Sequence, residues 1–210
     1  MTAGLLVKTA IFPLHFWLPP AHGSAPAPVS ALLHAVAVVK AGAFAIVRVV
    51  YEMFGIEFAA TLGVLTPLAM VAAVTIVYGS LRALMQDELK KRLAYSTVSQ
   101  VSYIVLGTAL LGPVATTGAL VHLVHQGLMK ITLFFSAGNY AETLGVHHVS
   151  EMDGIGRRMP LTTAAFTVGA LGMIGVPPVA GFVSKLYLGA GAAQAGQWWA
   201  IGVLAVSSLL

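Results

Sequence analysis

The 210-residue sequence contains no cysteine and very few charged residues. The absence of cysteine excludes disulfide bonds, thiolate zinc sites and cysteine-bound iron–sulfur clusters. Charged residues make up 9% of the chain, whereas an average soluble domain has about 25%. Hydrophobic residues make up 58% of the chain, and the mean hydropathy is +0.90. This composition predicts an integral membrane protein.

Acidic residues are missing from the long apolar segments. All seven acids lie in expected loops or at their edges: Glu52, Glu57, Asp87, Glu88, Glu142, Glu151 and Asp153. In contrast, the apolar segments contain Lys8, Lys40, Lys130 and Lys185. A lysine at the centre of a membrane helix costs roughly 2.5–3.5 kcal/mol, and four would cost on the order of 10 kcal/mol. No packing role offsets that cost, so these lysines are expected to have a function.

The four lysines differ in their depth. Lys40 and Lys130 lie near the middle of their segments, where a functional role is favoured over snorkelling. Lys8 and Lys185 lie closer to segment ends, where snorkelling to the headgroups is an equal alternative. Arg48 lies near a helix end and is interpreted as an anchor.

The predicted fold is all-α, a polytopic bundle of transmembrane helices. Apolar windows place helices near 1–18, 28–51, 59–81, 93–111, 114–141, 160–188 and 197–210. Two of these helices are expected to be discontinuous, because proline removes a backbone donor: one at Pro13, the other at Pro177 and Pro178. A single such segment favours an ordinary proline kink. Two interrupted segments favour an ion pathway.

The basic residues of the loops predict the orientation. Loops 82–92 and 142–159 hold Arg82, Lys90, Lys91, Arg92, Arg157 and Arg158, and the alternate loops hold no Lys or Arg. The positive-inside rule therefore places these two loops in the cytoplasm and the chain in the cell membrane. The net charge of +4 is weak evidence for a nucleic-acid partner, so none is expected.

Helix 114–141 carries a line of polar residues. His122, Gln126 and Lys130 follow an i, i+4, i+8 spacing and share one face, with His125 on its flank. Histidine titrates near neutral pH, so this line suits proton relay, although a buried histidine is also commonly a hydrogen-bonded structural residue. A His–Lys pair without a carboxylate is a poor metal site, so no metal is expected.

His34 lies about 9 Å before Lys40 along the same predicted helix, within reach of it through one or two waters. The sequence has no phosphate-binding loop and no flavin or nicotinamide fingerprint, so no cofactor is expected.

Four stretches carry a specific resemblance to a known family. These are VKTAIFPLHFWLPPAHGSAPAPVSALLHAVAVVKAG, LKKRLAYSTVSQVSYIVLG, HQGLMKITLFFSAG and GIGRRMPLTTAAFTVGALGMIGVPPVAGFVSK. They resemble the antiporter-like proton-conducting membrane subunits of respiratory complex I, energy-converting hydrogenases and Mrp-type cation/proton antiporters. The last stretch, with DGIGRRMP and GVPPVAGFVSK, is most similar to the D branch of the Mrp-type antiporters.

The resemblance implies an inverted pair of five-helix repeats, each with one broken helix, within about 14 helices. Residues 1–210 would then form one transmembrane domain, a partial copy from about helix 7 to helix 13. Lys8 and Lys185 match the family's lysines at the two helix breaks. Lys40 matches the lysine that connects them, and His122 and Lys130 match the central His and Lys.

The sequence departs from the family pattern in two ways. Gln126 stands where many members have a histidine, with His125 beside it, which leaves the relay role of that histidine open. The family's glutamate that pairs with the first-break lysine would lie before residue 1, so a piece of a longer protein is expected.

The implied function is proton translocation within a multi-subunit membrane complex, without a redox centre in this chain. In the implied mechanism, separating Lys8 from a glutamate outside this chain drives a proton through Lys40 and the His122/Lys130 pair towards Lys185.

The expected partners are other integral membrane subunits, the lipid bilayer, protons, and Na⁺ or another monovalent cation. Two types of complex are possible: a redox-driven quinone oxidoreductase or hydrogenase, and a cation/proton antiporter. The presence of cofactor-bearing peripheral subunits in the purified complex would indicate the first, and their absence the second. A non-conducting scaffold subunit or truncated remnant is the alternative, and such a scaffold would retain coupled transport after Lys130→Ala.

Overall fold

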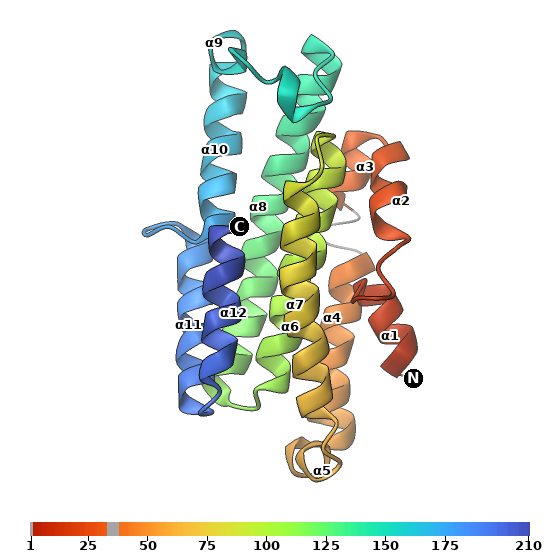
Figure 1. Ribbon diagram of the computed structural model, residues 1–210, viewed down its shortest axis with the longest axis vertical. Coiled ribbons are helices and arrows are strands. Elements are labelled where there is room, and N and C mark those ends of the chain that lie inside the picture. Colours follow the sequence, from red (N-terminus) through yellow and green to blue (C-terminus); the bar gives the residue numbers. More distant parts are fainter. Residues whose placement is uncertain (1, 33–37) are drawn as a thin grey trace.

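The computed structural model describes residues 2–32 and 38–210, and the described helices form a bundle along one long axis (Figure 1). The fold is all-α, as predicted. The helices are α1 (Thr2–Thr9), α2 (Leu18–Ser24), α3 (Ala27–Leu32), α4 (Val38–Arg48), α5 (Ile56–Thr61), α6 (Leu65–Leu84), α7 (Leu89–Ala109), α8 (Pro113–Leu144), α9 (Ile155–Arg158), α10 (Pro160–Ile174), α11 (Ala180–Gln194) and α12 (Trp198–Leu209). Val49–Phe54 form a π-helical segment, η2, and Val149–Glu151 a 3₁₀ turn, η3.

Most predicted segments match these helices within a few residues, with three corrections. The helix predicted to end at 188 continues to Gln194, the end of α11. The segment predicted at 59–81 is not continuous, because α5 ends at Thr61 and Gly63, with φ +64°, turns the chain before α6 begins. The loop predicted at 82–92 is shorter, because Arg82 lies in the last turn of α6 and α7 begins at Leu89. Of the helix predicted at 28–51, residues 33–37, which include His34, lie outside the described residues.

Both predicted helix interruptions are present, near mid-height of the bundle in Figure 1. The first begins earlier than Pro13, because α1 ends at Thr9 and Ala10 adopts a φ of +57°. The second runs from Gly175 to Val179 and contains Pro177 and Pro178. Two helices therefore start and stop within the bundle, which leaves helix-end carbonyls in its interior.

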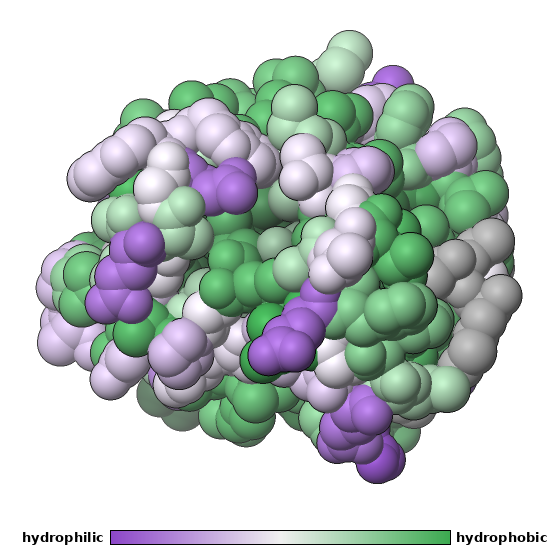
Figure 2. Space-filling view, turned by 90° about the horizontal axis from the view of Figure 1, so that it is seen from below, coloured by the Kyte–Doolittle hydropathy of each residue, from purple (hydrophilic) through white to green (hydrophobic). Residues whose placement is uncertain are grey.

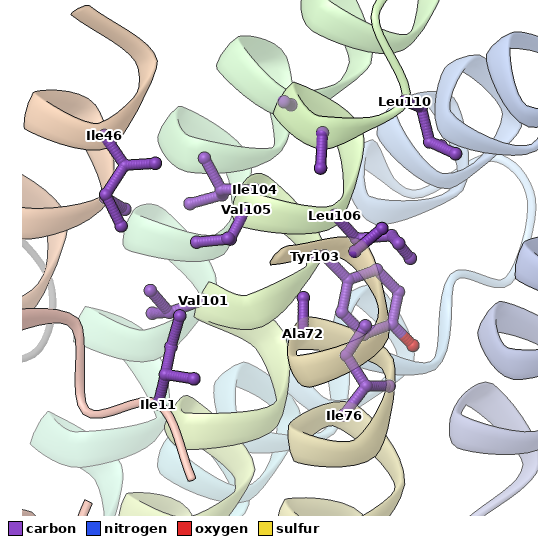
Figure 3. Packing of buried hydrophobic residues seen from close by; sticks show 14 of the residues in the cluster. Ile11, Ile46, Ala72, Ile76, Val101, Tyr103, Ile104, Val105, Leu106 and Leu110 are labelled. Carbon is purple, nitrogen blue, oxygen red and sulfur yellow. The ribbon is translucent and has the colours of Figure 1, made fainter. Parts of the chain in front are cut away.

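The centre of the bundle is α7, which packs against both α6 and α8. Val98, Val101 and Ile104 of α7 are fully buried. Figure 3 shows Val101 facing Ile11 on one side of α7 and Tyr103 lying beside Ile76 of α6 on the other. Because α7 is covered on nearly all sides from Thr97 onward, its polar residues from Thr97 to Thr108 are buried as well.

The outer surface is largely apolar. Figure 2 shows a few separate hydrophilic patches on a mostly hydrophobic end of the molecule. Helices α6 and α8 are long and apolar enough to cross a membrane. Large apolar side chains are also exposed on these two helices, among them Met70 and Val74 of α6 and Val124 and Leu128 of α8, and such side chains suit contact with lipid or with other membrane helices.

Two loops are joined at the end of the bundle where α6 meets α7. The Asp87 carboxylate accepts hydrogen bonds from Ser150 N at 3.0 Å and Ser150 Oγ at 2.8 Å. Val149 N donates to Asp87 O at 2.8 Å, and Leu89 N donates to His147 O at 2.9 Å. The segment after α8 is therefore held against the α6–α7 loop. We call this contact the loop clamp.

The loop clamp predicts a specific pH dependence. The hydrogen bonds from Ser150 hold the pKa of the Asp87 carboxyl below its ordinary value. A carboxyl with a lowered folded-state pKa contributes stability above its ordinary pKa of about 3.9 and loses it as pH falls through the folded value. Asp87→Ala should therefore lower the thermal unfolding midpoint of the complex at pH 7.

The difference between wild type and Asp87→Ala should then narrow below about pH 4, because wild type loses the same contribution there. Asp153→Ala, which removes an exposed carboxylate from the same connecting segment, is the control and should change the midpoint little. A difference of the same size at every pH would show that the clamp does not depend on the Asp87 charge.

Candidate functional site

Lys130 lies on α8 and is fully buried. Its Nζ donates to Leu93 O at 2.9 Å and to Ser96 Oγ, both in the first turns of α7. Its charge also acts on His22 of α2, a buried histidine. None of the ion pairs among the described residues includes Lys130. The ammonium group is therefore held by neutral oxygens.

Lys40 connects α4 to α8. Its side chain is 5% exposed, and its Nζ donates to Leu123 O at 2.6 Å. A cavity of about 370 Å³ lies beside it, lined by residues that include Phe44, Val124 and Leu128. Leu123 directly follows His122 in the chain, so Lys40 reaches the polar line of α8 at that point.

His122 lies at the meeting point of α7, α8 and α11. It is fully buried, and its Nδ1 shares a hydrogen bond of 2.9 Å with Ser184 Oγ. Its ring stacks on Tyr103 at a centroid distance of 5.2 Å. Lys40 binds the carbonyl of the next residue, Leu123, and Lys185 Nζ lies over the same Tyr103 ring at 5.3 Å from its centroid, so both lysines are close to His122.

Gln126 lies one turn after His122 and one turn before Lys130. It is fully buried, and neither of its amide atoms has a hydrogen-bond partner among the described residues. The half-buried His125 beside it has a buried Nδ1 that also lacks such a partner. Buried polar atoms of this kind are normally satisfied by water. The region between His122 and Lys130 is therefore suited to hold water.

Lys185 is positioned by the second helix break. Its Nζ donates to Met173 O at 2.8 Å and Ile174 O at 3.0 Å, which are carbonyls of the last turn of α10. These carbonyls have no helical partner because α10 stops there, and a cation at a helix C-terminus is favourable. A third bond, at 2.8 Å, goes to Ser208 Oγ of α12. The break thus creates the binding site for this lysine.

Lys8 does not join this group. It lies in the last turn of α1 and is exposed, although the next residue, Thr9, is buried against Gly42 of α4. His34, the remaining predicted site residue, lies outside the described residues. The structure therefore brings Lys40, His122 and Lys185 together, and places Lys130 about two turns further along α8.

Sequence reasoning missed several polar residues of the site: Ser184, Tyr103, His22 and His15. His15 lies in the first break and is fully buried among aromatic rings, at centroid distances of 4.6 Å from Phe16 and 4.9 Å from Tyr78. The two histidines flank the WLPPA stretch, which was a usable signal. No sequence feature pointed to Ser184 and Tyr103, because only the packing of α7 and α11 brings them to His122.

The arrangement does not favour metal binding. Over residues 2–32 and 38–210, no group of three or more His, Asp or Glu side chains is close enough to hold a metal ion. The chemistry available is that of titratable lysines and histidines, hydroxyl groups and free carbonyls.

These features define a class. Buried ionisable residues beside broken helices, inside an apolar bundle, are the mark of a membrane protein that moves ions. A family model described as "NADH:quinone oxidoreductase/Mrp antiporter, TM" matches residues 1–210. The chain belongs to this family of transmembrane antiporter-like subunits.

Individual relatives agree with the family match. The chain is 47% identical over 211 aligned residues to an NADH-quinone oxidoreductase subunit N of Desulforudis audaxviator, covering 100% of this chain and 42% of that protein. It is 39% identical to an NAD(P)H-quinone oxidoreductase chain 4 of Synechococcus elongatus, covering 86% of this chain and 33% of that protein. The chain therefore spans less than half the length of these relatives.

Two solved structures share the fold. The Mrp complex from a Dietzia species superposes with a TM-score of 0.93 at 31% identity, covering 99% of this chain and 38% of that chain. A membrane-bound sulfane sulfur reductase, an archaeal respiratory membrane complex, superposes with a TM-score of 0.91 at 32% identity, covering 99% and 42%. The predicted antiporter-like fold is confirmed, and the finer assignment to the D branch of the Mrp-type antiporters stays a prediction.

Proposed function

We propose that this chain moves protons across the membrane as an antiporter-like subunit of a multi-subunit complex. The observation that supports it best is that Lys40, Lys130 and Lys185 are each bonded to neutral carbonyl or hydroxyl oxygens. A carboxylate partner would hold a lysine permanently charged. Neutral partners and nearby water allow the same lysine to bind and release a proton.

The proposed pathway begins at Lys8, where a glutamate outside this chain would stabilise the lysine as a cation. Separating the two charges would drive a proton to Lys40, on to His122 and Lys130, and from there towards Lys185. His125 and His34 are proposed to supply further proton-binding groups. The hydrogen bond from Lys40 to Leu123 O, next to His122, supports the first part of this order.

The partners would be other integral membrane subunits, of either an NADH-quinone oxidoreductase-like or an Mrp-like complex. The transported ions are protons and, in the second type, Na⁺ or another monovalent cation. We infer a location in the cell membrane. The α6–α7 connection with its flanking helix ends (82–92) and the segment 142–159 would lie on the cytoplasmic side because of their six basic residues.

The test is Lys40→Met in the whole complex, reconstituted in liposomes that contain a pH-sensitive dye. Proton movement, started with NADH and quinone or with an imposed Na⁺ gradient, should fall roughly 100-fold, the loss typical of a positioned acid–base group. Arg48→Met is the matched control on the same helix, because Arg48 is exposed and pairs with Glu52 one turn away. If Lys40→Met left proton movement unchanged, the scaffold alternative would be favoured instead.

A further inference from the structure

A second cavity, of about 280 Å³, lies where α6, α7 and α12 meet, with α8 and α10 contributing to its wall. Its polar lining is mostly hydroxyl groups, and its residues come from parts of the chain more than a hundred positions apart. The polar lining residues are Ser80, Arg92, Ser96, Ser99, Gln100, Ser207 and Ser208. None of the residues that line it is acidic.

Three of these serines form a closed cluster. Ser80 of α6 lies 2.9 Å from Ser99 of α7 and 2.7 Å from Ser207 of α12, measured between Oγ atoms. Ser99 and Ser207 are 3.2 Å apart. Each hydroxyl can both donate and accept, so the direction of these hydrogen bonds can reverse without moving the helices.

Two further serines link the cavity to the lysines. Ser96 lines the cavity and accepts a hydrogen bond from Lys130 Nζ. Ser208 also lines it and accepts a hydrogen bond from Lys185 Nζ at 2.8 Å. One cavity is therefore bordered by hydroxyl groups bonded to both lysines.

The alternative connection, through His122, has a gap. His122 and Lys185 lie on the ring of Tyr103, with His122 stacked at 5.2 Å and Lys185 Nζ at 5.3 Å from the ring centroid. The face of an aromatic ring binds a cation but has no proton to exchange. The exchangeable group of Tyr103 is its hydroxyl, which donates to Leu204 O at 3.5 Å, on the helix that carries Ser207 and Ser208.

We propose that the serine-lined cavity holds water and carries the proton from Lys130 to Lys185, bypassing His122; this inference rests on the proposed function. The ammonium group of Lys130 gives a proton to Ser96 or an adjacent water, and each hydroxyl or water passes one proton on as it receives one. Ser208 delivers a proton to neutral Lys185. Every serine remains a neutral hydroxyl with its O–H turned the other way and rotates back before the next proton, so no co-reactant is needed.

The cavity suits water better than a metal cation. No carboxylate lines it to bind a metal cation, whereas the serine hydroxyls can both donate hydrogen bonds to water and accept them from it. The volume is sufficient for several water molecules. The Oε1 atom of Gln100 is buried in the cavity wall without a hydrogen-bond partner among the described residues, which is the kind of group that ordered water satisfies.

The first test is Ser207→Val in the whole complex, which removes the hydroxyl shared by the cluster and fills its space. Proton movement should fall about tenfold, less than the roughly 100-fold expected for a lost acid–base group. Thr167→Val, at an exposed hydroxyl of α10 that bonds only within its own helix, is the control and should keep wild-type activity. Ser99→Ala with Ser207→Ala, which removes two hydroxyls without adding volume, covers the case in which valine prevents assembly.

The second test measures hydration. Because the chain has no cysteine, Ser207→Cys introduces a single thiol into it. A small neutral methanethiosulfonate should modify this thiol in the purified complex, and should not modify Ser102→Cys, a fully buried α7 position outside the cavity. Equal protection of both thiols would overturn the water-filled cavity.

The outcomes separate this inference from the proposed function. If Lys40→Met abolishes proton movement and the serine variants keep it, the cavity route is wrong and the proposed function stands. If Lys40→Met and the serine variants all keep it, the proposed function itself is wrong.

Discussion

Replacing Lys130 with Met is expected to stop proton movement through the complex while leaving this chain folded and assembled. Lys130 is fully buried at the middle of the proposed pathway, next to both the Gln126 region and the serine-lined cavity. Removing its titratable group should lower proton movement roughly 100-fold. Stability should not fall with it, because replacing a buried ionic group by an apolar one is often neutral or stabilising.

The groups that Lys130 leaves behind are already satisfied. Leu93 O also accepts hydrogen bonds from Ser96 Oγ at 2.9 Å and Thr97 Oγ1 at 3.0 Å. No buried acceptor is therefore left without a partner, which is what usually makes such a substitution destabilising. Lost proton movement with unchanged stability would identify Lys130 as a proton-carrying residue. A purely structural lysine would instead lower the stability and leave proton movement in the folded protein intact.

The measurement is dye-reported proton movement in proteoliposomes, together with the thermal unfolding midpoint of the same preparation. Lys91→Met is the control, because Lys91 is a half-buried lysine near the helix start that pairs with Glu88 one turn away. Wild-type proton movement in Lys130→Met would contradict the pathway and favour a scaffold subunit.

Replacing Gly181 with Ala is expected to destabilise the second helix break and displace Lys185. A Cβ atom at Gly181 would lie 1.8 Å from the carbonyl oxygen of Gly172, so α10 and α11 would have to separate. Overpacking of this kind costs about 1–3 kcal/mol, and more where backbone must move. Because Lys185 is held by the last carbonyls of α10, the same separation would remove its hydrogen bonds.

Gly189→Ala is a matched control on the same helix. No atom lies within 4 Å of a Cβ placed there, and alanine is favoured over glycine in a helix by about 1 kcal/mol. Gly189→Ala should therefore raise or keep the unfolding midpoint, while Gly181→Ala lowers it and reduces proton movement. Similar midpoints for the two variants would show that α10 and α11 are not in close contact at Gly181.

Much of the fold could be predicted from local features of the sequence. Long apolar windows mark the helices because every backbone group must be paired inside a bilayer. Pro13, Pro177 and Pro178 mark the breaks because proline cannot donate the next helical hydrogen bond. The start of α6 was missed because Gly63 and the short helix α5 lie inside an apolar window, and hydropathy does not detect a turn made by apolar residues.

The site was predictable only in part. The sequence by itself determined that Lys40, Lys130 and Lys185 lie in apolar segments without carboxylates, because charge and hydropathy are properties of composition and spacing. Their partners come from elsewhere in the chain: Lys40 binds a carbonyl 83 residues away, and Lys130 one 37 residues away. The exposure of Lys8 was equally hidden, because it depends on which helices cover α1.

The serine cluster is the clearest example of a feature that the sequence alone does not predict. Ser80 and Ser207 are 127 residues apart and lie in helices whose sequences look like ordinary membrane segments. A serine in such a helix usually bonds to its own backbone, so its presence predicts no contact. Only the packing of α12 against α6 brings the two hydroxyls to 2.7 Å, because tertiary contacts between helices are set by the shapes of whole surfaces and not by the spacing of residues within one helix.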